Sequence, residues 1–134
     1  MKKLATIILA IVLVSCELPT DNYEFGRYYG QWLGRNNEIG LQLNIQHYVY
    51  KNSHEISGNG TLLWYGEWEV EIANPVITPD GLITFQLVLR DVLENGGDYV
   101  FQCESQNYDN HKFDLWIGPG IDTILHMEPG KWAR

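Results

Sequence analysis

The sequence predicts an all-β protein in which eight antiparallel strands close into a single up-and-down meander barrel. Apolar residues alternate with polar ones through most of the chain after residue 26, which is the period of a half-buried strand. No stretch of eleven residues or more has the spacing of an amphipathic helix. The alternating segments are joined by short connections, which link antiparallel neighbours. Closure into a barrel removes exposed strand edges, and a two-sheet β-sandwich is the alternative.

Residues 1–15 have the two parts of a secretory signal peptide. Lys2 and Lys3 give a positive start, and Leu4 to Val14 is apolar except for Thr6. As a helix those eleven residues would reach about 16 Å, whereas the hydrocarbon core of a bilayer is about 30 Å thick. We therefore expect this segment to be removed rather than to span a membrane.

The run Leu13-Val14-Ser15-Cys16 resembles the lipobox of bacterial lipoproteins. The resemblance implies that the Cys16 thiol receives a diacylglyceryl group, and that cleavage before Cys16 makes it the mature N-terminus. Acyl chains then hold the protein on a membrane of the bacterial cell envelope, the outer membrane in a Gram-negative organism. Residues 16–26 are predicted to be the lipidated N-terminus and tether, and 27–134 the barrel domain; an ordinary signal peptide with a chance cysteine is the alternative.

The first half of the domain contains four predicted strands, over 27–34, 40–50, 55–64 and 67–77. In 40–50 the odd positions from Leu41 to Val49, His47 included, share one face. In 67–77 the side chains of Trp68, Val70 and Ile72 oppose a row of glutamates.

The second half contains the other four, over 82–90, 98–105, 111–117 and 122–128. Phe85 and Phe101 lie on the apolar faces of the first two. Turn residues separate the segments, in the runs "TPDG" at 78–81, "ENGGD" at 94–98, "NYDN" at 107–110 and "GPG" at 118–120.

Two short runs carry a further resemblance. "YYGQW", with Gly30 and Trp32, is similar to the Gly-x-Trp that opens the first strand of lipocalins and avidin-like barrels. "ISGNGTL" is similar to the small-residue third strand of small bacterial barrel lipoproteins. The resemblance implies a lipocalin-like barrel in which the tryptophan closes one end.

Charge and motifs narrow the function classes. Without Lys2 and Lys3 the 9 Lys and Arg become 7 against 17 Asp and Glu, a formal charge of −10, which disfavours nucleic acid as a partner. No nucleophile motif such as Gly-x-Ser-x-Gly, phosphate loop or dinucleotide fingerprint is present, so we expect a non-enzymatic protein without a cofactor. Cys103 has no mature partner for a disulfide once Cys16 is lipidated, and is expected to be a buried, inert thiol.

Metal binding is not favoured by the candidate ligands. Glu67, Glu69 and Glu71 share a strand face, a pattern more typical of a solvated surface than of a calcium site. His126 and Glu128 are two apart, but one such pair is too few for zinc.

Two functions stay open at this point. In the first, the barrel interior binds a small apolar ligand, and the expected lining residues are Trp32, His47, Trp64, Trp68, Phe85 and Phe101. His47 fits equally a hydrogen-bonded interior role, which its inward register favours. In the second, the acidic outer face, with Tyr48, Tyr50 and the Glu67 to Glu71 row, binds or inhibits another protein.

Overall fold

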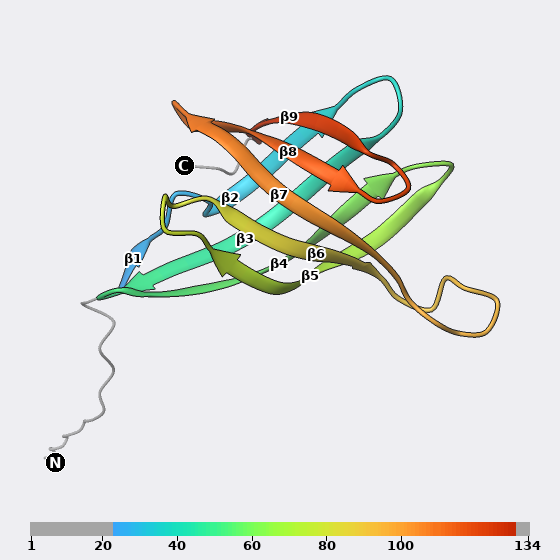
Figure 1. Cartoon of the computed structure of the whole chain (residues 1–134), viewed down its shortest axis with the longest axis horizontal. Helices are drawn as coiled ribbons and strands as arrows, with labels where there is room; N and C mark the ends of the chain where they lie inside the picture. The colour runs from blue at the N-terminus through green and yellow to red at the C-terminus, as the bar shows by residue number, and fades with distance from the viewer. Residues whose placement is uncertain (1–22, 131–134) are drawn as a thin grey trace, which may run out of the picture.

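The structure, a computed structural model, describes residues 23–130 and is all-β, with no helix among those residues (Figure 1). The predicted signal peptide and Cys16 lie outside them. The nine strands are β1 (Tyr23–Phe25), β2 (Gly30–Arg35), β3 (Gly40–Tyr50), β4 (Ser53–Leu63), β5 (Glu67–Ile77), β6 (Ile83–Leu89), β7 (Tyr99–Asp109), β8 (Lys112–Gly118) and β9 (Thr123–Pro129). Within the described residues, no helix is long and apolar enough to cross a bilayer.

Strands β2 to β9 form a closed antiparallel meander barrel, as the sequence predicts. Each strand pairs with the next along the chain, and β2 closes the ring by pairing with β9, where Trp32 lies opposite Pro129 and Leu33 opposite Glu128. Figure 1 shows the long strands crossing the molecule obliquely, with turns gathered at its two ends. This architecture is compatible with a lipocalin-like barrel.

Each predicted strand overlaps an observed one, and β3 and β5 have the predicted bounds. β7 differs most: it continues to Asp109, four residues past its predicted end and into the predicted turn at 107–110, with a register shift between Gln106 and Asp109 in its pairing with β8. β2 begins at Gly30, three residues later than predicted, because the chain turns between Gly26 and Tyr29, where the Tyr29 amide donates to the Gly26 carbonyl. Before that turn lies the additional strand β1, inside the segment predicted as the tether. It pairs with the end of β3 that β2 does not reach.

The interior is filled by the inward side chains of all eight barrel strands. Among residues 23–130, twenty hydrophobic residues are buried, including Leu43, Leu62, Leu87 and Leu115, none of which is exposed to solvent. At about 25 cal/mol per Å² of buried apolar surface, this interior is the main source of stability.

Glycine on β4 allows the backbones of β3 and β4 to approach closely. A Cβ atom at Gly60 would lie 1.8 Å from the backbone oxygen of Gln42, and one at Gly58 would lie 2.5 Å from that of Asn44. The backbones of β3 and β4 therefore approach too closely for a side chain, which explains the small residues of "ISGNGTL".

Candidate binding groove on the outer face

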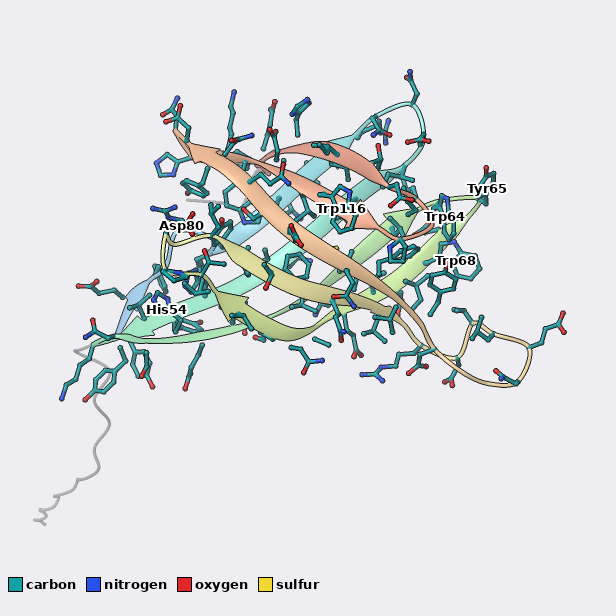
Figure 2. All side chains as sticks on the ribbon, in the orientation of Figure 1. His54, Trp64, Tyr65, Trp68, Asp80 and Trp116 are labelled. Atoms are coloured by element: carbon teal, nitrogen blue, oxygen red, sulfur yellow. The ribbon has the colours of Figure 1, made fainter. Side chains whose placement is uncertain are left out.

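The six residues expected to line a cavity all point into the barrel, but four of them are packed as core. Trp32, His47, Phe85 and Phe101 are between 0% and 3% exposed. Trp64 and Trp68 are half-buried at the end that carries the β4–β5 turn (Figure 2), where the Trp68 indole donates to the Trp64 carbonyl at 2.8 Å. Trp64 also meets the edge of Phe101 with ring centroids 5.4 Å apart.

The opposite end of the barrel is closed by a second aromatic cluster, built around Trp32. Its ring lies 4.8 Å from that of Phe113 and 6.4 Å from that of Tyr108, and its indole donates to the Tyr28 carbonyl at 2.8 Å. The Arg27 guanidinium covers the outer side of Tyr108 at 4.5 Å. Trp32 is thus part of the aromatic packing that fills this end of the barrel.

His47 is an interior, hydrogen-bonded histidine. Its Nδ1 accepts from the Tyr28 amide at 3.3 Å, so Nδ1 carries no proton, and Nε2 must donate to Nδ1 of His54 at 2.9 Å. Burial, followed by the charges of His54 and Arg27, lowers the pKa of His47 to about 4. His47 is therefore neutral at pH 7, and its ring serves to hold the Gly26 to Tyr28 turn against β3.

Cys103 is 1% exposed, and burial raises the pKa of its thiol well above the ordinary value. A thiol in this environment is a core residue with little thiolate at neutral pH.

The register of the sheet builds a row of outward side chains that crosses five strands. Glu128 on β9 lies opposite Leu33 on β2, Leu33 opposite Gln42 on β3, Gln42 opposite Thr61 on β4, and Thr61 opposite Glu69 on β5. Because side chains at paired positions share a face, these five project together from the barrel wall.

Two hollows lie over this row and share Thr61 and Glu67. The first, of about 780 Å³, is lined by residues of β2, β3, β4, β5 and β9, including Leu33, Gln42 and Leu63. The second, of about 600 Å³, continues over β3, β4 and β5, where Asn44, Asn59 and Glu69 line it. We call the two hollows together the outer groove.

The outer groove combines exposed apolar groups with carboxylates. Leu33 and Leu63 are 45% and 40% exposed, and both line the first hollow. Glu71 is paired with Arg90 at 3.0 Å, and Arg90 also holds Asp98 at 3.1 Å. Glu67 and Glu69 have no ion-pair partner among residues 23–130. The lining of the groove contains Arg35 and Arg90 but a larger number of glutamates, Glu67, Glu69, Glu71 and Glu128, so the groove carries an excess of negative charge.

His126 lies at the edge of the groove and is engaged by a neighbouring strand. Its Nδ1 lies 2.6 Å from Oδ1 of Asp114, and the Asn107 side chain donates to the other oxygen at 3.2 Å. Burial alone would raise the pKa of Asp114, but the hydrogen bonds from His126 and Asn107 lower it below its usual value. Within the described range no three His, Cys, Asp or Glu side chains are grouped as metal ligands.

The structure separates the two parts of the outer face that the sequence analysis grouped together. Tyr48 lies opposite Glu55 near the start of β4, whereas Glu69 lies opposite Thr61, six residues further along that strand. Tyr48 and Tyr50 instead belong to a cluster of five aromatic side chains at the β1 end of the barrel. We call this cluster the aromatic patch; it consists of Tyr23, Phe25, Tyr29, Tyr48 and Tyr50.

Sequence reasoning did not identify Leu33, Gln42, Thr61 or Leu63 as candidate binding residues. The available signal was an apolar residue out of phase with the alternation, since Leu33 follows inward Trp32 and Leu63 follows inward Leu62. That signal identifies the two leucines, but it does not reveal the pairing of β2, β3 and β4 that places them on the same part of the outer face. In comparisons with known proteins, no family model, curated protein or solved structure matches this chain.

Proposed function

We propose that this chain is a non-enzymatic lipoprotein of the bacterial cell envelope, anchored by a lipid on Cys16, that binds a protein partner through the outer groove. The observation that carries the proposal is the contrast between the two sides of the barrel wall. The interior is occupied by buried side chains, whereas the outer groove presents exposed leucines beside unpaired carboxylates.

The side chains of the groove define the chemistry of the partner. Leu33 and Leu63 suit an apolar side chain, and the amides of Gln42 and Asn44 suit backbone or polar groups. Glu67 and Glu69 favour lysine or arginine, and the net charge of −10 on the mature part steers a basic partner toward the barrel. We therefore expect a protein segment that carries both apolar and basic residues.

A small apolar ligand inside the barrel is less well supported. Such a ligand needs space between the strands, but Trp32, Phe85 and Phe101 are almost fully buried against their neighbours. Room for a ligand would require these rings to leave packed positions, at a cost of several kcal/mol if one large side chain is displaced.

Two measurements test the proposal separately. The intact mass of the chain purified from its native membrane should correspond to a polypeptide that begins at acylated Cys16; an unmodified or uncleaved chain contradicts the anchor. A photoreactive amino acid at Leu63 should then crosslink one protein in intact cells. The same group at Val100, which is 38% exposed on the outer face of β7, serves as the matched control.

A partner of the groove should also respond to its charge. Glu67→Lys and Glu69→Lys should each reduce the Leu63 crosslink, because they repel a basic segment, while leaving the fold intact on an exposed strand face. Equal crosslinking at Leu63 and Val100, or no effect of either charge reversal, contradicts the groove as a binding site.

A further inference from the structure

The aromatic patch is an exposed apolar surface of different chemistry from the outer groove. β1 pairs with β3 so that Tyr23 lies opposite Tyr50 and Phe25 opposite Tyr48. The rings contact one another, with centroids 4.2 Å apart for Phe25 and Tyr29, and 5.2 Å apart for Tyr23 and Tyr50. Phe25 nevertheless remains 62% exposed, so the strand pairing that orders this ring does not bury it.

The patch is placed next to the predicted lipid anchor. Tyr23 belongs to the patch, and Cys16 is seven residues earlier in the sequence. Seven residues reach at most about 25 Å when fully extended, so a lipid on Cys16 would hold the patch within that distance of the bilayer. Figure 1 shows β1 at the end of the barrel opposite the β4–β5 turn, and Figure 2 shows Tyr65 at that far end.

The residue types of the patch are those that favour a membrane interface. Tyrosine rings have an apolar body and a polar hydroxyl, which suits the boundary between headgroups and acyl chains, and phenylalanine gains most by leaving water. Lys51 in the adjoining turn lies with Nζ 5.4 Å from the Tyr50 ring centroid, where its chain can extend an ammonium group toward lipid phosphates.

We propose that the aromatic patch docks on the membrane interface and fixes the orientation of the barrel, with the β3–β4 turn toward the bilayer and the β4–β5 turn away from it. This inference depends on the lipid anchor of the proposed function. Burial of the rings drives the docking, because Glu55 lies opposite Tyr48 on the face of the patch and the mature part carries a charge of −10. Neutral phosphatidylcholine should therefore support docking as well as anionic lipid does.

Paramagnetic relaxation in nanodiscs tests the orientation. The mature lipidated chain is placed in phosphatidylcholine nanodiscs that contain a phosphatidylcholine with a nitroxide near the top of one acyl chain. We expect strong broadening of the amide signals of residues 23–25 and 48–51, and little at Tyr65, which is 93% exposed at the other end. Broadening that is absent or equal at both ends overturns the inference.

Substitutions measure how much the aromatic rings contribute to docking on the membrane. Phe25→Ser should lower the ratio of docked to undocked molecules about tenfold, as expected for the loss of one partly inserted phenyl ring. Tyr65→Ser is the matched control, since it removes an exposed ring from the opposite end and should leave the broadening unchanged. Equal behaviour of Phe25→Ser and the unchanged chain would overturn the role of the patch.

The outcomes distinguish this inference from the anchor on which it depends. A chain whose mass shows no acyl group, and which does not enter nanodiscs, contradicts the anchor. An acylated chain that enters nanodiscs but shows no selective broadening contradicts only the docking. If the same residues become protected from solvent in detergent as the protein concentration rises, the patch binds a second copy of the chain. If their NMR signals shift when envelope saccharide fragments are added, the patch binds a glycan. Either result overturns the membrane assignment.

Discussion

Nε2 of His47 lies 2.9 Å from Nδ1 of His54 across the β3–β4 hairpin, joining a buried imidazole to an exposed one. The buried ring cannot take a proton on Nδ1 without losing the hydrogen bond from the Tyr28 amide. The pair therefore holds His47 in one neutral tautomer and makes the fold at this end of the barrel sensitive to acid.

The first prediction concerns the pH dependence of stability. The pKa of His47 is about 4 in the folded chain and about 6.5 when unfolded, so the unfolded state binds more protons between these values. The free energy of unfolding should therefore fall by about 2 kcal/mol through His47 alone as the pH falls from 7 to 5. Denaturant unfolding at a series of pH values measures this fall in the free energy of unfolding.

A pair of variants isolates this contribution. His47→Asn keeps an acceptor for the Tyr28 amide but does not titrate, so its stability should depend less steeply on pH in that window. His111→Asn is the control, because His111 has a φ of 61°, a conformation that asparagine tolerates, and the substitution leaves His47 and its contribution in place. The prediction fails if the unchanged chain, His47→Asn and His111→Asn all lose the same stability as the pH falls from 7 to 5.

The second prediction concerns the close approach of β3 and β4. Gly60→Ala places a methyl group against the Gln42 backbone, and because backbone atoms cannot rotate away, it should destabilise the barrel by roughly 2 kcal/mol or more. Gly40→Ala is the control, since its Cβ would meet Leu63 at an ordinary 3.4 Å. Thermal unfolding of both variants decides the matter, and equal melting temperatures would contradict the close approach.

The third prediction concerns thiol reactivity. Cys103 should be inert to a thiol reagent at pH 8 in the native chain and should react once the chain is unfolded in guanidinium, because burial raises the pKa of its thiol. With Cys16 acylated, the count should change from zero thiols to one. Rapid modification of Cys103 in the folded chain would contradict its placement in the core.

Much of the fold could be predicted because its signals are local. The alternation in β3 and β5 continues for whole strands between clear turn residues, and both strands have the predicted bounds. β1 was not predicted because three residues, Tyr-Glu-Phe, are too few for a period. Its partner is the distant end of β3, and the ladder continues with the Gly26 amide donating to the His47 carbonyl. The outer groove was not predicted because the alternation shows which residues face outward but not which of them lie side by side on different strands, and only the register aligns Leu33 with Gln42 and Thr61.

The fourth prediction concerns the hydrogen bond between the Tyr28 hydroxyl and the Ser105 hydroxyl, which are 2.5 Å apart inside the barrel. Both residues are buried, at 0% and 4% exposure, so removal of one hydroxyl leaves the other without this partner. Tyr28→Phe and Ser105→Ala should each cost about 1 to 3 kcal/mol of unfolding free energy. The double variant should cost less than the sum of the two, because it leaves neither hydroxyl of the pair behind. Strict additivity in this cycle would show that the two hydroxyls do not interact, and would contradict the contact between the turn that precedes β2 and strand β7.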